Sequence, residues 1–243
     1  MNLTSKILIS LAVLVFGIYG FYNLSYPTTL INYRLALEVM TPEGPKTGSG
    51  VIQVSYGSQF NLNGGGRSGV VRLTGEAVPI DLGHGKFLFV TLTNDMSGRQ
   101  GSPGKLDGAL DASLLPVKIF GFSWNKGEES SLASQANLAR EAGSRDVPIM
   151  SLPTLVTFQD LNDVKSIRLV MAENPAAVLG TGYWLKKATI TLTNDPPTEG
   201  IEKLLVWLKQ MLEPKPLANG NHFESQLNLV VPLRALKSVE MPP

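Results

Sequence analysis

The stretch INYRLALEVMT, residues 31–41, decides the fold class because its apolar and polar side chains alternate. One face of this stretch takes the larger apolar side chains Tyr33, Leu35, Leu37 and Val39. Alternation with a period of two is typical of a β-strand with one buried face. A TPEG turn follows, and GVIQVSY at residues 50–56 resembles a returning strand. The region therefore predicts an antiparallel meander.

The rest of the chain continues this strand pattern. Residues 70–82 and 86–93 predict the clearest hairpin, with Gly83-His84-Gly85 as its turn. Further strand-like segments lie at residues 154–158, 166–170, 183–193 and 226–231. We expect a mainly β fold of the α+β class, an antiparallel sandwich or curled sheet with a few peripheral helices.

Helical signals are fewer. Residues 94–150 predict an irregular or helical insertion, with a helix that starts at Ser130 or Ser131 and runs through Ala142. The strongest helical pattern follows Thr198, the expected N-cap, and continues to Leu212 with one apolar stripe. Residues 57–69, which contain a glycine triplet, are expected to form a loop.

The N-terminal stretch Ile7 to Tyr22, ILISLAVLVFGIYGFY, contains no charged residue. As a helix it covers about 24 Å at ~1.5 Å per residue, against roughly 30 Å for a bilayer core. No small-residue cleavage site follows it, so an uncleaved transmembrane signal anchor is favoured over a cleaved signal peptide. We expect residues 1–25 to be a membrane anchor and residues 26–243 a separate β-rich domain.

The charges that flank this stretch set the expected orientation. Lys6 precedes it, and the first charge after it is Arg34. The positive-inside rule then keeps the N-terminus in the cytoplasm and exports the remainder. We expect a single-pass protein of the bacterial inner membrane with its folded domain in the periplasm.

Composition narrows the function classes. The formal net charge is +1 and no run of like charges occurs, which argues against nucleic-acid binding. The chain has no cysteine, so disulfides and a lipid-modified cysteine are excluded. No motif predicts a cofactor, since the Gly-rich stretch 64–69 is followed by strand-like sequence where a dinucleotide-binding loop needs a helix.

Several residues are candidates for chemistry, and each also has a purely structural interpretation. The catalytic candidates are Glu76, Asp81, His84 and Lys105. Glu76 and Asp81 offer paired carboxylates, His84 a base at a hairpin tip, and Lys105 the end of an S-x-x-K pattern. Turn capping, solvation and chance are the more common explanations of such patterns.

Two further sets of residues suggest binding. Asp160 and Asp163 have the spacing of oxygen ligands for calcium, but the rest of an EF-hand loop is missing. Trp207 lies off the apolar stripe of its expected helix, so it is either a partly exposed anchor for a protein partner or the membrane, or a residue packed beneath the C-terminal tail.

Four motifs together suggest a family. TPEG, GEAVPIDLGHGKFLF, TLVTFQDLNDVKSIRLV and ATITLTNDPPTEGIEKLLVWL resemble an uncharacterised proteobacterial family of proteins with an N-terminal membrane segment. The resemblance implies an envelope location and a layout, but no activity. The chain departs from the family pattern at MAENPAAVLGTG, residues 171–182, where relatives tend to an acidic Asp-Pro turn and Phe-Gly.

These observations lead to one preferred function and two alternatives. The preferred function is a membrane-anchored periplasmic accessory or interaction module with a protein partner in the cell envelope and no identifiable catalysis. The first alternative is a membrane-tethered hydrolase that uses carboxylates or a Ser-Lys pair. The second is a protein that binds a small ligand or lipid in a cavity between sheet faces.

Overall fold

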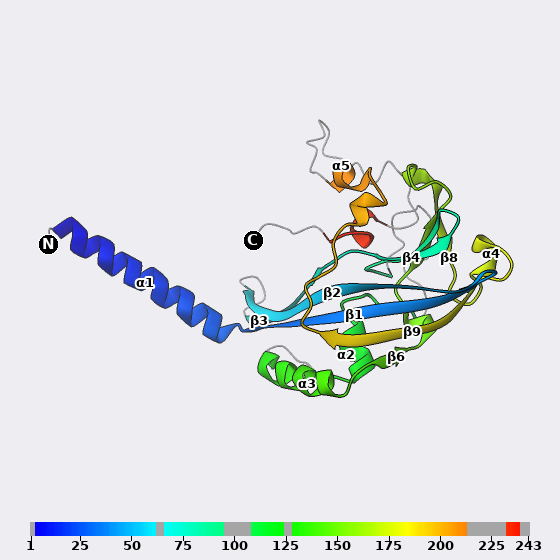
Figure 1. The fold of residues 1–243 in the computed structure, drawn as a ribbon. Coiled ribbons are helices and arrows are strands. Elements are labelled where there is room, and N and C mark those ends of the chain that lie inside the picture. The colour runs from blue at the N-terminus through cyan, green and yellow to red at the C-terminus, as the bar shows by residue number, and fades with distance from the viewer. Residues whose placement is uncertain (1–2, 62–65, 95–107, 124–127, 213–231, 239–243) are drawn as a thin grey trace.

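The protein is described by a computed structural model in which one long helix leads into a β-rich body (Figure 1). The description covers residues 3–61, 66–94, 108–123, 128–212 and 232–238. Helix α1 (Leu3–Ser25) projects from the body, and strand β1 begins three residues after it ends.

Two antiparallel sheets form the body. The first has five strands in the order β3-β2-β1-β9-β6, and the second has four in the order β4-β5-β7-β8. The strands of the first sheet are β1 (Thr28–Thr41), β2 (Gly44–Asn61), β3 (Gly66–Thr74), β9 (Trp184–Thr193) and β6 (Arg145–Val147). Those of the second are β4 (Val78–Gly83), β5 (Lys86–Val90), β7 (Leu155–Phe158) and β8 (Ile167–Val170).

The remaining elements are short. The helices after α1 are α2 (Leu115–Phe120), α3 (Glu129–Glu141), α4 (Ala176–Leu179) and α5 (Leu208–Leu212). The described residues also form four 3₁₀ turns: η1 (Ile149–Ser151), η2 (Val164–Ser166), η3 (Ile201–Lys203) and η4 (Leu233–Ala235).

The inner face of the first sheet carries the main core. The alternation of β1 buries its apolar set completely, namely Ile31, Tyr33, Leu35, Leu37 and Val39. Helices α2 and α3 and the second sheet share this core, to which they contribute Leu115, Leu132 and Leu88. The predicted insertion near residues 94–150 is therefore helical, but its helices pack into the core instead of lying at the periphery.

Strand β4 crosses very close to strand β2. A Cβ atom on Gly48 would lie 2.3 Å from the carbonyl oxygen of Pro79 and 2.9 Å from the Cα atom of Ile80. Only glycine allows the two backbones to approach this closely. The second sheet is therefore seated on the first at Gly48.

The far face of the second sheet has its own core, which the C-terminal segments cover. Phe89 and Val156 from the sheet pack with Leu205, Leu208 and other residues of the last third of the chain. Phe158 and Phe89 meet edge to face at a centroid distance of 5.6 Å. The body thus has three layers: the first sheet, the second sheet, and a cover of short helical turns.

Residues 194–200, which we term the strap, link β9 to this cover. At its start, Asp195 pairs with Arg34 at 2.8 Å. Farther on, Thr198 exchanges two hydrogen bonds with Val51, one from its backbone N–H at 2.9 Å and one to its hydroxyl oxygen at 2.8 Å. The strap reaches the second core at Ile201, whose N–H donates to Glu76 at 2.8 Å.

The mainly β fold with antiparallel sheets is confirmed, but several element boundaries differ from expectation. The strand expected over residues 70–82 divides at Gly75, whose φ of +151° separates β3 from β4. The loop expected over residues 57–69 is largely strand, because β2 runs to Asn61 and β3 begins at Gly66.

The helix expected from Thr198 to Leu212 is wrong. Thr198 is bonded to strand β2 instead of capping a helix, and only η3 and α5 are helical in this region. Helix α3 begins at Glu129, so Ser130 and Ser131 lie inside it and do not cap it.

The structure also bears on the expected transmembrane anchor. In the described part of the chain, no helix combines the length and the apolar character that crossing a membrane requires. The expectation of a spanning helix is therefore not met.

Candidate functional site: an apolar helix and an open sheet face

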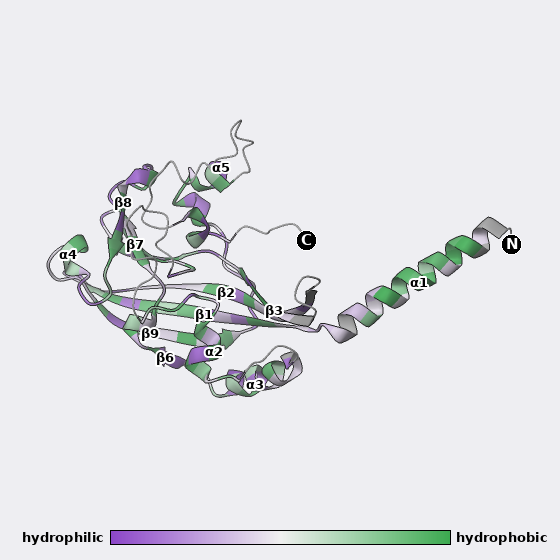
Figure 2. Ribbon diagram, turned by 180° about the vertical axis from the view of Figure 1, so that it is seen from behind, coloured by the Kyte–Doolittle hydropathy of each residue, from purple (hydrophilic) through white to green (hydrophobic). Residues whose placement is uncertain are grey.

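Helix α1 exposes apolar side chains on all sides. Its large apolar residues between Ile7 and Tyr22 are 45–74 % exposed, and no described charged residue lies among them. Figure 2 shows hydrophobic residues along most of the helix, while the body mixes both characters. A helix that is apolar all round is normally buried in protein or in lipid.

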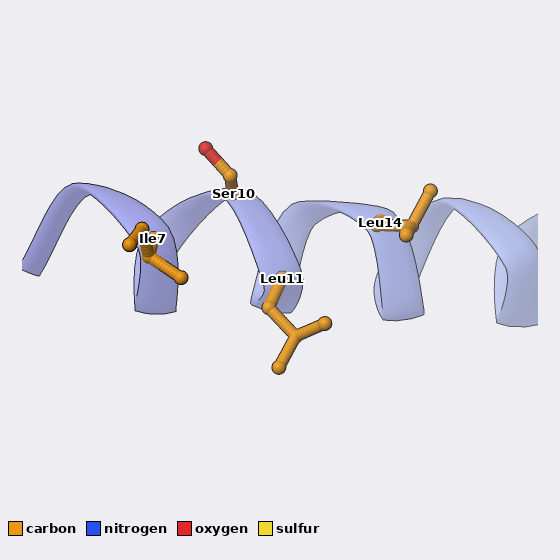
Figure 3. Close-up of a pocket in the computed structure, with 4 residues that line it drawn as sticks. All are labelled: Ile7, Ser10, Leu11 and Leu14. Carbon is orange, nitrogen blue, oxygen red and sulfur yellow. The ribbon is translucent and has the colours of Figure 1, made fainter. Parts of the chain in front are cut away.

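A close view shows how these side chains are placed. Ile7, Leu11 and Leu14 project with Ser10 from successive turns and line a hollow that consists of α1 residues alone (Figure 3). Leu11 and Leu14 leave the helix on different sides. The helix therefore offers an apolar surface around its axis.

The second candidate is the open part of the first sheet's outer face, which we term the outer face. It consists of residues that are exposed or half-buried on the three central strands: Ala36, Glu38 and Met40 of β1, Pro45, Thr47 and Ser49 of β2, and Trp184, Lys186 and Thr189 of β9. The strap borders this face at the end nearer α1, where Asp195 bonds Asn32 and Arg34.

An apolar row crosses the outer face at the end of the sheet away from α1. Met40 is the Cα partner of Pro45 on one side and of Trp184 on the other. Trp184 is 51 % exposed, and Pro45 is exposed beside it. Exposed tryptophans with polar surroundings are common anchors of protein interfaces.

Two ion pairs adjoin this row. Lys186 pairs with Glu38 at 2.8 Å, and Lys187 pairs with Asp146 on β6 at 3.0 Å. A β-bulge at this point leaves both lysines exposed, because one extra residue of β9 lies opposite the step from Glu38 to Val39. The region therefore carries two cations and two anions.

His84 joins two hairpin turns at the same end of the sheet. Its Nε2 atom contacts the Glu43 carboxylate of the β1–β2 turn, and this hydrogen bond lowers the pKa of Glu43. His84 has a φ of +53°, and it is the only non-glycine residue with positive φ among those described. The side chain is 75 % exposed. Its role in the structure is to tie two turns together.

Glu76 is the most enclosed of the candidate carboxylates. It lines a pocket of about 130 Å³ with Thr198, Glu199 and Ile201 among its neighbours. Its Oε2 atom accepts the Ile201 N–H, and its Oε1 atom lies 2.8 Å from Lys237 Nζ. Both oxygens are therefore engaged in fastening the C-terminal segments to the sheet.

Lys237 bridges Glu76 and Glu202, and its Nζ atom lies 3.0 Å from Oε1 of Glu202. Burial alone would lower the pKa of Lys237, but its hydrogen bonds to the two carboxylates raise it. The lysine is therefore held charged, and it has no free pair of electrons for nucleophilic or base chemistry at neutral pH.

The described catalytic candidates Asp81 and His84 do not join Glu76. Asp81 accepts the Gly83 N–H at 2.8 Å in its own turn, and neither Asp81 nor His84 lines the Glu76 pocket. Lys105 lies outside the described residues.

The two calcium candidates also serve local turns. Asp160 accepts the Asn162 N–H, and Asp163 accepts the Lys165 N–H, each at 2.9 Å. Within the described ranges, no three acidic, histidine or cysteine side chains are grouped as metal ligands would be.

Trp207 is a packed residue in this structure. Its indole N–H donates to the Leu161 carbonyl at 2.8 Å, and its ring lies 5.7 Å from that of Phe158. Trp207 therefore packs against Leu161 and Phe158, which does not test the expected alternatives of an exposed anchor or a residue packed beneath the C-terminal tail.

The sequence reasoning missed Trp184. Counting in twos back from the buried residues Ile190 and Ala188 places Trp184 on the buried face. The bulge at Lys186 reverses that assignment. The adjacent lysines 186 and 187, which cannot both be exposed in a regular strand, were the signal.

Comparisons with known proteins add no identification: no family model, no curated protein and no solved structure matches this chain.

Proposed function

We propose that this chain is a non-enzymatic accessory protein of a bacterial envelope, which α1 holds at the inner membrane with the body in the periplasm. The observation that carries this proposal is the exposed apolar surface on every side of α1. The resemblance to envelope proteins with an N-terminal membrane segment supports the location.

Lipid is the occupant that fits α1 best. A helix with a single apolar stripe would suit a protein groove, whereas an all-round apolar surface suits a medium that surrounds it. The 16 residues from Ile7 to Tyr22 cover about 24 Å at ~1.5 Å per residue. Attachment needs only that this length enters the apolar region of one membrane.

Binding by the body is favoured over catalysis. The best enclosed carboxylate, Glu76, is held by an ion pair to Lys237 and by the Ile201 N–H, contacts that favour a structural role over general acid–base work. The outer face, by contrast, presents Trp184 with a rim of charges. We therefore assign the partner-binding role to the outer face.

Vesicle flotation of the full chain tests membrane attachment. Wild-type protein mixed with vesicles of phosphatidylethanolamine and phosphatidylglycerol should rise with them in a density gradient. Leu11→Lys with Leu14→Lys should stay at the bottom, because burying lysine in the apolar region is costly. The matched control is Leu138→Lys, a residue of α3 that is 70 % exposed and should float like the wild type.

Two results would overturn the attachment. One is wild-type protein that does not float, and the other is a double variant that floats as well as Leu138→Lys does. Protease added to spheroplasts should digest the body, whereas intact cells should protect it. Protection in spheroplasts would contradict the periplasmic location alone.

A further inference from the structure

We propose that the outer face binds a second copy of this chain, so that two membrane-attached molecules pair through their first sheets. This inference rests on the proposed function, because it takes both α1 helices to be in one membrane. It goes beyond that function by assigning the partner. Three features of the outer face lead to it.

The first feature is charge. Glu38 and Lys186 form one pair across β1 and β9, and Lys187 and Asp146 form another across β9 and β6. The two cations of β9 lie between one anion on β1 and one on β6, so this part of the face has no net charge. A surface without net charge does not repel a copy of itself, and a shift by one strand lays the two lysines of β9 over Glu38 of the second copy.

The second feature is register. A two-fold axis parallel to the strands and between β1 and β9 lays β9 of one copy over β1 of the other at equal height. Trp184 then lies over Met40 of the second copy, because these two residues are Cα partners within one sheet. By the same rule, Lys187 faces Glu38 of the second copy, and Lys186, the extra residue of the bulge, lies beside it.

The row nearer α1 fits in the same way. Ala36 and Thr189 are Cα partners within one sheet, so Ala36 of one copy faces Thr189 of the other. The small alanine side chain leaves room for the larger threonine. Two sheets can pack face to face in this aligned manner at about 10 Å.

The third feature is the position of α1. A two-fold axis parallel to β1 leaves both N-terminal helices at the same end of the pair, where one membrane can hold both. Antiparallel pairing of two edge strands would instead send the helices in opposite directions. Membrane attachment therefore selects the face over the edges.

The strap sets the strength of the pairing. The strap covers β1 at Arg34, so only the part of β1 from Ala36 to Met40 is open to a second copy. This part is about 13 Å long at ~3.3 Å per residue. Across three strands about 4.8 Å apart, this length covers roughly 190 Å² of sheet on each copy, well below the roughly 1,200–2,000 Å² that stable dimers bury. Confinement in one membrane compensates by raising the effective concentration.

Cysteine crosslinking tests the pairing, since the chain has no cysteine of its own. Purified full-length Ala36→Cys, reconstituted in the vesicles described above, is treated with a short bismaleimide and scored as dimer on a denaturing gel. The matched control is Ala177→Cys, an exposed alanine of α4. We expect at least ten-fold more dimer for Ala36→Cys.

Variants in the Ala36→Cys background test the contacts. Trp184→Asp and Glu38→Lys should each lower the dimer yield at least five-fold. Lys187→Glu added to Glu38→Lys should restore it, because a lysine and a glutamate again face each other between the copies.

The failures of the two proposals can be told apart. If Ala36→Cys floats with vesicles but crosslinks no more than Ala177→Cys, the pairing is wrong and the attachment stands. If it does not float, the attachment is wrong. Crosslinking in cell membranes to a different protein, without the two-copy product, would also overturn the assignment of the second copy.

Discussion

Two tyrosines carry hydroxyl groups into the main core, and each meets a backbone carbonyl just before α2. Tyr33 donates to Ala112 at 2.6 Å, and Tyr56 donates to Ser113 at 2.5 Å. Burial, together with the nearby Tyr56, raises the pKa of Tyr33 well above its usual value, and burial also raises the pKa of Tyr56. A buried hydroxyl with a partner stabilises the fold, and an ionised one would break it.

Tyr33→Phe should lower the free energy of unfolding by about 1 kcal/mol at pH 7, because the Ala112 carbonyl loses its donor. A raised folded-state pKa means that the tyrosine's contribution is present below pH ~10 and is lost as the pH rises above it. The fall in stability between pH 9 and pH 11 should therefore be shallower in the variant. Urea unfolding across this range measures both effects, and an unchanged slope would contradict the burial argument.

The Glu76–Lys237–Glu202 cluster predicts unequal effects of two similar substitutions. Glu76 is 5 % exposed and Glu202 is 34 % exposed in their side chains. Glu76→Gln should cost roughly 2 kcal/mol, because it weakens a buried charged contact to Lys237. Glu202→Gln should cost under ~1 kcal/mol, as exposed pairs do.

Urea unfolding of the two variants at pH 7 checks this order. The raised pKa of Lys237 means that its contribution persists through neutral pH and is lost as the pH rises through that pKa. Equal costs for the two variants would show that Glu76 is not the principal fastener of the C-terminal segment.

Close backbone approach and hydrogen bonds between distant segments of the chain set the arrangement of the elements. Strand β4 can lie on β2 because Gly48 has no side chain, and the strap follows its course because Thr198 bonds the edge of β2 beyond the end of β3. Neither contact leaves a local sequence pattern, since each joins residues far apart in the chain.

Gly48→Ala should destabilise the protein by about 1–3 kcal/mol, the usual cost of forcing extra atoms into a filled contact. The new Cβ atom would meet the backbone of Pro79 and Ile80, which cannot turn aside as a flexible side chain does. Thermal unfolding measures the effect, and Ser49→Ala, on the exposed side of the same strand, serves as the control. A Gly48→Ala protein as stable as the control would contradict the crossing.

The contact of the strap with β2 gives a second prediction at this scale. Thr198→Val removes the hydroxyl that accepts the Val51 N–H but keeps the shape of the side chain. The free energy of unfolding should fall by about 1 kcal/mol, the net worth of a typical hydrogen bond. Amide exchange at Val51 should quicken, and unchanged exchange there would count against the bond.

Much of the sheet architecture could be predicted from local alternation. The patterns in residues 31–41 and 86–93 predicted strands where β1 and β5 lie. The pattern in residues 198–212 predicted one helix and was wrong, because Thr198 and Ile201 are held by Val51 and Glu76 from distant segments. Apolar spacing records burial, and here the burial comes from a cover of short turns.

The candidate site was harder to predict. Trp184 is exposed only because a bulge shifts the register of β9. The alternation of apolar residues in one strand does not show where a bulge lies. Glu76 was predicted as a candidate, but its partner Lys237 lies 161 positions away in the sequence. The ion pair between the two residues could therefore not be predicted from local sequence. Local sequence shows residue types, and the fold decides which of them meet.

At the scale of the whole molecule, an apolar helix and an open sheet face occupy different ends of one body. Helix α1 leads into β1, and the Trp184 row lies at the far end of the same strand. We assign α1 as the membrane attachment and the Trp184 row as part of the contact between copies. Both assignments require α1 to lie in lipid.

Spin labels on α1 test that requirement most directly. Single cysteines replace Ile7, Leu11, Leu14 and Ile18 in the full chain, each carries a nitroxide, and the protein is reconstituted in vesicles. We predict that all four labels are accessible to molecular oxygen and shielded from a water-soluble nickel chelate. Labels that are open to the chelate, or shielded from both reagents as in a protein core, would contradict the attachment of this protein to a membrane through α1.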